Sequence, residues 1–249
     1  MQHPVYYFLN KFFMNEVEDN ILAHLKNNNK VIFDVGCYRG EFTKSLIKED
    51  KKLNLISKFY LFDPNPNVKN YLNNLLTDQK VKYFNIAFDN SNLLKKFYLN
   101  KFFEPSGSSL KKITIEDKKW MVSRKMFMQI FQPFKKIKNY EEIDVQTQTL
   151  DNFCEKENIN KIDLLKIDTE GNELNVLKGA KNLLSQNKIS TIYVEIIESK
   201  KKYNLKEKEV VEYLKNFNFK HEKSYPIRSL SFLSGLRGTD NLFVSKNEN

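Results

Sequence analysis

Short, continuously apolar segments alternate with helical patterns along most of this chain, and this alternation constrains the fold more than any other feature. Strands that are covered on both faces of a parallel sheet carry such unbroken apolar runs. We expect strands at residues 31–35, 59–62, 81–88, 162–167, 189–196 and 242–245. We expect helices at residues 12–26, 41–48, 68–76, 173–184 and 207–216. The pattern predicts an α/β fold, a parallel sheet with helices on both faces.

The length of 249 residues suits a single domain with a substantial core. We expect residues 1–29 to form an N-terminal helical extension and residues 101–145 a basic, aromatic lid or insertion. The lid contains apolar residues at helical spacing, from Phe127 to Phe134. Two interpretations stay open: a helix that packs its aromatic rings on the core, or a lid that recognises an anionic or lipid-linked acceptor.

The net charge of +10 favours binding to phosphates, but only four of the 41 basic residues are arginine. Arginine is the better ligand for phosphates and base edges, so nucleic acid is not the favoured partner. Lysine and asparagine that are abundant together also fit an adenine- and thymine-rich genome. Two cysteines give no disulfide framework, and no apolar run is long enough to span a bilayer. The N-terminus lacks the basic region of a secretory signal, and we expect a cytoplasmic protein without a transmembrane segment.

A glycine-containing loop follows the first expected strand and is the first candidate binding site. Glycines there let the chain turn tightly and approach a ligand. The loop lacks the Gly-x-Gly-x-x-Gly pattern that seats a dinucleotide, and an acid before the first glycine suits an amino group. These features favour S-adenosylmethionine over NAD, although a purely structural turn remains an alternative. The candidate cofactor-binding residues of this loop are Asp34, Gly36, Cys37, Tyr38 and Gly40.

Two further strand ends carry residues that could bind the ribose and the adenine of S-adenosylmethionine. Asp63 follows the second apolar run, where its carboxylate could accept both hydroxyls of a ribose, with Pro64 beside it. Ala87 and Phe88 end the third run and could form an apolar wall for adenine. Because ligands of open α/β sheets bind beyond the carboxyl ends of the strands, we expect these residues to lie together. An acid at a strand end can also be a simple helix cap.

The second half of the chain resembles the FkbM-type methyltransferase family. Residues 149–151 read TLD, residues 162–174 read IDLLKIDTEGNEL and residues 176–180 read VLKGA, similar to that family's TLD, IDLLKIDVEGxE and VLKGA stretch. Upstream, residues 34–40 resemble its DVGANxG loop, residues 62–66 its FEPNP segment and residues 107–110 its SSL element. The resemblance covers about residues 28–110 and 145–197.

This resemblance implies a Rossmann-like class I methyltransferase with a mostly parallel seven-stranded sheet and helices on both faces. It also implies S-adenosylmethionine as methyl donor and a hydroxyl of a sugar, glycan or related metabolite as acceptor. The chain departs from the family pattern at Tyr38, where Asn is usual, and at Asp63, where Glu is usual. Thr169 stands in place of Val.

Methyl transfer to a hydroxyl needs a group that accepts the proton, and the carboxylates near the fourth and fifth strand ends are the candidates. We expect Asp168 to be this base, with Glu170 or Glu195 as orienting groups or bases. Glu170 could instead only complement a helix dipole. The same carboxylates could hold Mg²⁺, an alternative that we do not favour.

Two other classes of function remain open from the sequence. One is an RNA methyltransferase, although no Asn-Pro-Pro-Tyr-like motif of amine methylation follows the fourth strand. The other is a non-catalytic binding module with a methyltransferase fold, which Tyr38 would create if its ring crowded the cofactor loop.

Overall fold

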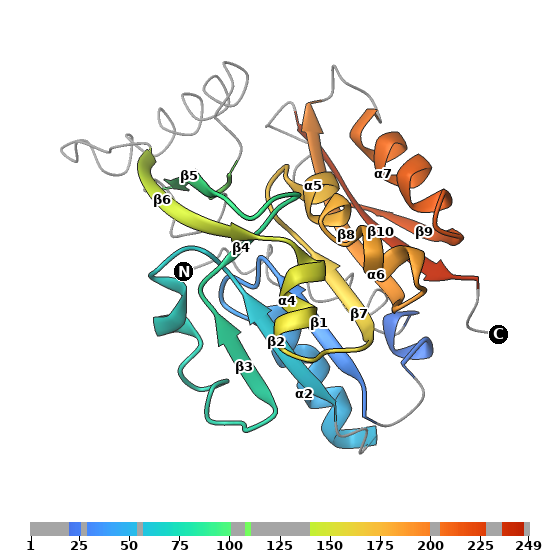
Figure 1. Ribbon diagram of the computed structural model, residues 1–249. Coiled ribbons are helices and arrows are strands. Elements are labelled where there is room, and N and C mark those ends of the chain that lie inside the picture. Colours follow the sequence, from blue (N-terminus) through green and yellow to red (C-terminus); the bar gives the residue numbers. More distant parts are fainter. Residues whose placement is uncertain are drawn as a thin grey trace.

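The structure is a computed structural model that describes residues 20–25, 29–53, 57–100, 108–110, 140–199, 205–227 and 236–246. Its centre is a seven-stranded sheet (Figure 1). The strands follow one another in the order β3 (Val81–Phe84), β2 (Lys58–Phe62), β1 (Val31–Val35), β7 (Ile162–Ile167), β8 (Ile189–Ser199), β10 (Leu236–Ser245) and β9 (Phe219–Pro226). The pairs from β3 to β8 are parallel, whereas β10 runs antiparallel to both of its neighbours.

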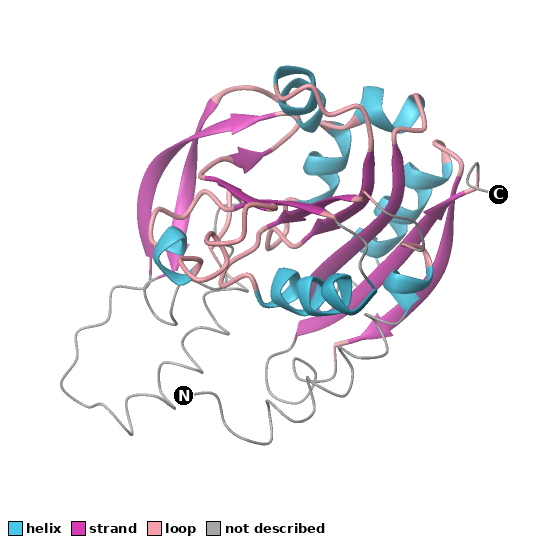
Figure 2. Ribbon diagram, turned by 90° about the horizontal axis from the view of Figure 1, so that it is seen from below, coloured by secondary structure: helices cyan, strands magenta, loops and turns pink. Residues whose placement is uncertain are grey.

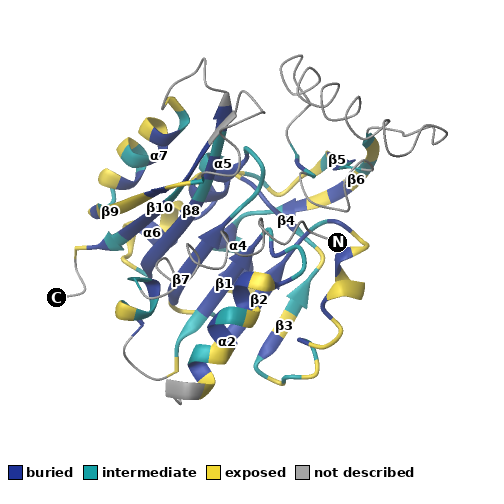
Figure 3. Ribbon diagram, turned by 180° about the vertical axis from the view of Figure 1, so that it is seen from behind, coloured by how far each residue is buried: buried dark blue, intermediate teal, exposed yellow. Residues whose placement is uncertain are grey.

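Helices cover both faces of this sheet and enclose two hydrophobic cores. One face carries α4 (Leu150–Lys156), α5 (Glu173–Lys178), α6 (Lys181–Ser185) and α7 (Leu205–Lys215). The other face carries α2 (Glu41–Leu53) and the 3₁₀ turn η1 (Val68–Tyr71). Figure 3, which is turned by 180° from Figure 1, has this face toward the reader. Successive residues of β1 alternate between the cores, since Ile32 packs on the α2 side and Phe33 on the α4 side.

Local sequence explains where these helices begin. Thr149 caps α4, because its side chain accepts a hydrogen bond from the amide of Asn152. Asp151 accepts the amides of Asn182 and Leu183, at 2.9 Å each, and so secures the first turn of α6. The TLD segment therefore fastens two helices that cover the sheet.

A second, three-stranded sheet lies beyond the carboxyl ends of the parallel strands. Its order is β4 (Ala87–Phe88), β6 (Tyr140–Gln148) and β5 (Leu94–Asn100). Figure 2 shows it curving along one side of the molecule. It buries a small core of its own that contains Ala87 and Phe97. This sheet supplies a wall next to the main sheet, at the end where the candidate residues gather.

Three expected elements differ in the structure. The strand expected at 81–88 is divided into β3 and β4, which belong to different sheets, and the side chain of Asn85 between them donates to the carbonyl of Asp63. The helix expected at 68–76 is only η1, in a segment rich in asparagine, a poor helix former. The helix expected at 173–184 is divided into α5 and α6 at Gly179.

The strands β5, β6 and β9 and the helix α4 were not expected, because polar residues interrupt their apolar pattern. The other expected strands and the helices at 41–48 and 207–216 are confirmed as β1, β2, β7, β8, β10, α2 and α7. Most of the expected helix 12–26 lies outside the described residues, as does most of the expected lid, whose residues 140–145 belong to β6. Within the described ranges, no helix is both long and apolar enough to span a membrane.

Candidate active site

A pocket opens at the carboxyl ends of β1, β2 and β7, between the main sheet and the small sheet. Its volume is about 110 Å³, several times the roughly 10–15 Å³ that one bound water requires. It is lined by Val35, Gly36, Tyr38, Phe62, Asp63, Pro64, Ile86, Ala87, Phe88, Phe97, Ser108, Leu110, Asp168, Thr169, Glu170 and Asn172. The structure thus brings together candidate residues from four separate segments of the sequence.

The glycine turn after β1 lies between the ends of the two neighbouring strands, β2 and β7. The amides of Gly36 and Cys37 both donate to the carbonyl of Phe62, at 2.8 and 3.1 Å. Gly36 has a φ of +78°, and a Cβ atom there would lie 1.7 Å from the carbonyl oxygen of Asp168. Only glycine fits this close approach of the turn to the end of β7.

Asp63 places a buried carboxylate at the end of β2. Its two oxygens accept the amides of Tyr38, at 3.1 Å, and Asn65, at 2.9 Å. Burial raises the pKa of Asp63 to about 6, although both backbone hydrogen bonds act in the opposite direction. Each carboxylate oxygen has a second lone pair, so the group can still accept hydroxyl donors from a ligand in the pocket.

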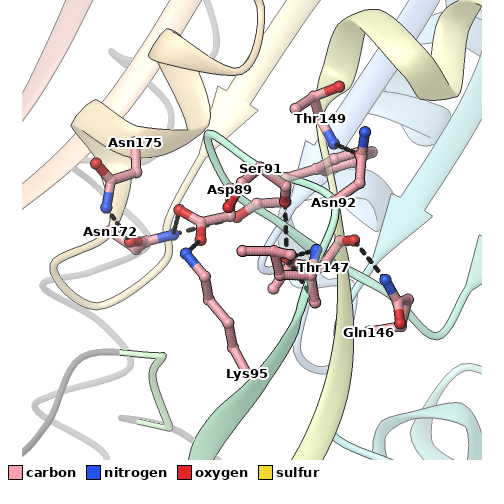
Figure 4. Close-up of polar contacts among 11 residues, drawn as sticks. Asp89, Ser91, Asn92, Lys95, Gln146, Thr147, Thr149, Asn172 and Asn175 are labelled. Carbon is pink, nitrogen blue, oxygen red and sulfur yellow. Dashed lines mark hydrogen bonds and ion pairs between the residues drawn. The ribbon is translucent and has the colours of Figure 1, made fainter.

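The apolar wall formed by Ala87 and Phe88 is held by a polar network at Asp89, which Figure 4 shows. Asp89 is 1% exposed and forms an ion pair with Lys95 of β5. The side-chain amide of Asn172 donates to the carbonyl of Phe88 at 3.1 Å and to Asp89 at 3.4 Å. Since Asn172 also lines the pocket, this network connects the apolar wall with the turn that follows β7.

The turn after β7 has an unusual backbone. Glu170 has a φ of +55° and Gly171 a φ of +107°. The buried side chain of Glu173 closes the turn, because it accepts the amide of Gly171 at 2.6 Å and the hydroxyl of Thr169 at 3.2 Å. The hydroxyl of Ser109 donates to the carbonyl of Glu170 at 3.0 Å. A left-handed residue such as Glu170 persists only where its surroundings hold it, and such residues cluster at functional sites.

Asp168 directly follows β7 on the pocket wall, and 28% of its side chain is exposed. Its carboxylate lies 3.4 Å from the ammonium of Lys166, a buried cation of the same strand. Burial alone lowers the pKa of Lys166, but the carboxylates of Asp34, Asp168 and Glu195 outweigh it and hold the pKa above its ordinary value. Lys166 is therefore charged, and its ammonium donates to the carboxylate of Asp168 at the pocket wall.

Four predicted site residues do not line this pocket. Asp34 is 1% exposed and faces Thr43 and Lys166 instead. Cys37 packs in the α2 core, and a Cβ on Gly40 would meet the side chains of Leu72 and Leu75. Glu195 lies on β8, where burial raises its pKa well above the ordinary value. The remaining predicted residues, Gly36, Tyr38, Asp63, Pro64, Ala87, Phe88, Asp168 and Glu170, all lie on the wall.

Sequence reasoning missed two charged residues next to these groups. Lys166 stands between the apolar residues Leu165 and Ile167 of β7, and a lysine in such a position is almost never buried without a partner. That signal could have identified it. Asp240 lies opposite Glu195 in the register of β8 and β10, and burial raises its pKa to about 7. Nothing in the polar sequence around Asp240 indicates this position.

The order of the main sheet, with its single reversed strand second from one edge, is the arrangement of class I methyltransferases. The pocket lies where ligands of such sheets bind, beyond the carboxyl ends of the central strands. Residues 34–221 match the family model of the methyltransferase FkbM domain. The chain belongs to this family and is an S-adenosylmethionine-dependent methyltransferase.

A curated relative is the 2-O-methyltransferase NoeI of Sinorhizobium fredii (strain NBRC 101917 / NGR234). It is 25% identical over 187 residues, which cover 72% of this chain and 68% of the relative. The N-methyltransferase NodS of Bradyrhizobium japonicum WM9 is similar in structure, with a TM-score of 0.41 and 9% identity over 94% of this chain and 96% of that one. The methyltransferase domain of bacterial CtHen1-CN has a TM-score of 0.44 and 12% identity over 95% and 99% of the two chains. The two structural similarities are too distant to carry an argument about this chain.

The residues of the pocket fit S-adenosylmethionine. Asp63 offers carboxylate oxygens to hydroxyl donors, and Ala87 and Phe88 offer a buried apolar surface to a flat ring. Asp63, Asp168 and Glu170 place carboxylates around a pocket that would receive a positively charged sulfonium. Among the residues that the structure describes, no group of three or more His, Cys, Asp or Glu side chains is arranged to hold a metal ion.

Proposed function

We propose that this methyltransferase acts on a hydroxyl of a sugar, glycan or related metabolite. The observation that carries the proposal is Asp168, a partly exposed carboxylate on the pocket wall that is oriented by a buried cation. An oxygen acceptor must lose its proton during transfer, and a positioned carboxylate can receive it. The name of the relative, a 2-O-methyltransferase, supports oxygen as the methylated atom. The resemblance to the FkbM family supports a sugar-type acceptor.

In this proposal S-adenosylmethionine supplies the methyl group and loses the positive charge of its sulfonium. Asp63 would accept the ribose hydroxyls, Ala87 and Phe88 would contact the adenine, and Gly36, Tyr38 and Pro64 would line the pocket between these two parts of the cofactor. Asp168 accepts the proton of the acceptor hydroxyl, and Glu170 lies beside it on the wall. Because the reacting oxygen and the methyl group must approach in line, positioning by these groups provides much of the rate.

Incubation with methyl-labelled S-adenosylmethionine and a panel of acceptors tests the proposal. The panel contains nitrophenyl glycosides of hexoses and 6-deoxyhexoses, nucleoside diphosphate sugars as anionic acceptors, and transfer and ribosomal RNA. We expect label in at least one glycoside or nucleotide sugar, as a methyl ether that NMR assigns to one hydroxyl. Label that enters RNA alone, or that enters an amine, would contradict the proposed acceptor class.

Binding of S-adenosylhomocysteine is expected to weaken as the pH falls through about 6, where Asp63 takes up a proton. Burial places the pKa of Asp63 in the folded protein above its ordinary 3.8. The contribution of this group to stability is therefore complete below 3.8 and is lost as the pH rises through about 6. Hydroxyl donors prefer the ionised carboxylate, so below that pH protonation competes with the ligand, and the dissociation constant rises by up to about tenfold per pH unit.

Calorimetric titration of the wild type and of Asp63→Asn measures this effect. At pH 8 the variant should bind roughly 10- to 100-fold more weakly, since a hydrogen bond to a charged group contributes about 1.5–3 kcal/mol. Its affinity should then be nearly independent of pH in the range where the wild type changes. A wild-type affinity that does not vary across this range would exclude Asp63 from the ligand contact.

A further inference from the structure

Lys166 is a buried cation at the junction of β1 and β7, and its surroundings link the pocket to the interior. Its side chain is 9% exposed, and its register partner on β1 is Asp34. The ammonium lies 3.1 Å from Asp34 and 3.4 Å from Asp168, and it donates to the carbonyl of Gly36 at 3.3 Å. The contacts with Gly36 and Asp168 are hydrogen bonds, and the contact with Oδ1 of Asp34 is an ion pair of two buried charges.

The three partners differ in how firmly they are held. Asp34 is enclosed, and its second oxygen accepts the hydroxyl of Thr43 on α2 at 2.7 Å. Gly36 and Asp168 instead lie on the pocket wall. Asp34, which Thr43 holds in place, therefore fixes the ammonium of Lys166 from the interior of the protein. On the side of the pocket the ammonium contacts Gly36 and Asp168, which would face the methyl donor and the methyl acceptor.

We propose that Lys166 is a positioning residue for methyl transfer, which holds the carboxylate of Asp168 and the turn at Gly36 in one arrangement. The inference rests on the proposed function, because it takes Asp168 as the proton acceptor. Asp34 then serves the cofactor site through Lys166 and does not itself contact the ligand.

The charge of Lys166 also acts on carboxylates of the neighbouring strands. Asp63 directly after β2, Glu195 on β8 and Asp240 on β10 all have pKa values that burial raises and that the charge of Lys166 lowers. The hydroxyl of Tyr193 on β8 belongs to the same group, because its pKa is raised by burial and then by Asp240 and Glu195. Removal of the positive charge should therefore shift the titration of these acids to higher pH, whereas loss of packing alone should not.

The test compares Lys166→Met, which keeps the length and removes the charge, with Lys166→Arg, which keeps the charge. For Lys166→Met we expect a kcat that is about 10- to 100-fold lower, as for a misplaced reacting group, with little change in the acceptor KM. In ¹³C-carboxyl NMR titrations of the ligand-free protein, the signals of Asp63 and Asp240 should move to higher pH. Lys166→Arg should leave these titrations close to the wild type and restore part of kcat.

Lys166→Met leaves Asp34 buried without its counter-charge, which can prevent folding. The double variant Asp34→Asn/Lys166→Met removes both charges of the buried pair, and the same loss of kcat is expected in it. Wild-type kcat in the double variant, or unshifted carboxyl titrations in both Met variants, would overturn the inference. Because the NMR titrations need no acceptor, they test Lys166 even if none of the glycosides is methylated, which would refute only the proposed function.

Discussion

Gly36→Ala is expected to lower the stability of the protein and to abolish measurable binding of S-adenosylhomocysteine. The new Cβ would lie 1.7 Å from the carbonyl oxygen of Asp168, and the residue has a φ of +78°. The left-handed conformation costs about 1–2 kcal/mol for a residue with a side chain, and crowding of a packed site adds about 1–3 kcal/mol. For a protein of this size the sum corresponds to a fall in Tm of roughly 5–20 °C. Calorimetry and thermal unfolding measure the two effects.

Gly40→Ala is the matched control for this variant. Gly40 also has a positive φ, but its new Cβ would meet the ends of the Leu72 and Leu75 side chains, which can move. Gly40 does not line the pocket. We therefore expect a smaller loss of stability and an affinity close to that of the wild type. Equal ligand affinities of Gly36→Ala and the wild type would show that the turn at Gly36 does not shape the cofactor site.

Asp168→Asn is expected to reduce kcat by about 10²- to 10⁴-fold, the usual effect of removing a general base. The amide keeps the size of the carboxyl group but cannot accept the proton of the acceptor hydroxyl. Affinity for S-adenosylhomocysteine should change by only a few fold, since the turn at Gly36 and the carboxylate of Asp63 remain. The measurement is steady-state kinetics on the glycoside that the acceptor panel identifies, together with calorimetry.

Asp163→Asn provides the control on the same strand. Asp163 lies at the opposite end of β7, where it forms ion pairs with Lys30 and Lys161 and accepts the amide of Val31. Its replacement should lower stability and leave kcat unchanged. If Asp168→Asn retained kcat within a few fold of the wild type, the proton acceptor would have to be another carboxylate, with Glu170 on the same wall as the next candidate.

Much of the fold could be predicted because buried parallel strands have recognisable apolar runs in the sequence. Residues 31–35 and 162–167 are mostly apolar, with Asp34 in the first and Asp163 and Lys166 in the second, and both form central strands. Edge strands carry less of this signal, since one side of each remains in water. The strand β5 reads LKKFYLN and β9 reads FKHEKSYP, so that charged residues interrupt the apolar ones, and neither strand was expected. The division at Gly179 depends on a close approach to Asp89, a residue 90 positions earlier, which no local pattern contains.

The candidate site could be predicted in part for a related reason. In a parallel sheet the ends of the strands share one edge, so the order of elements along the chain is enough to place Asp63 and Asp168 together. Phe88 reaches the same pocket from β4 of the small sheet, which the sequence did not predict. Which of them face the pocket could not be predicted in this way. Asp34 lies only two residues before Gly36, yet its side chain does not line the pocket and pairs with Lys166.

The sequence by itself determined the class of protein: an α/β methyltransferase with a turn at Gly36, acids at the strand ends and the FkbM segments. These features are local, because each depends on a run of neighbouring residues and its turn. Only the tertiary structure decided which acidic side chains line the pocket and which form ion pairs in the interior of the protein. Lys166 shows the reason, since its partners Asp34 and Asp168 come from different strands, and their distances to its ammonium depend on how β1 and β7 pair.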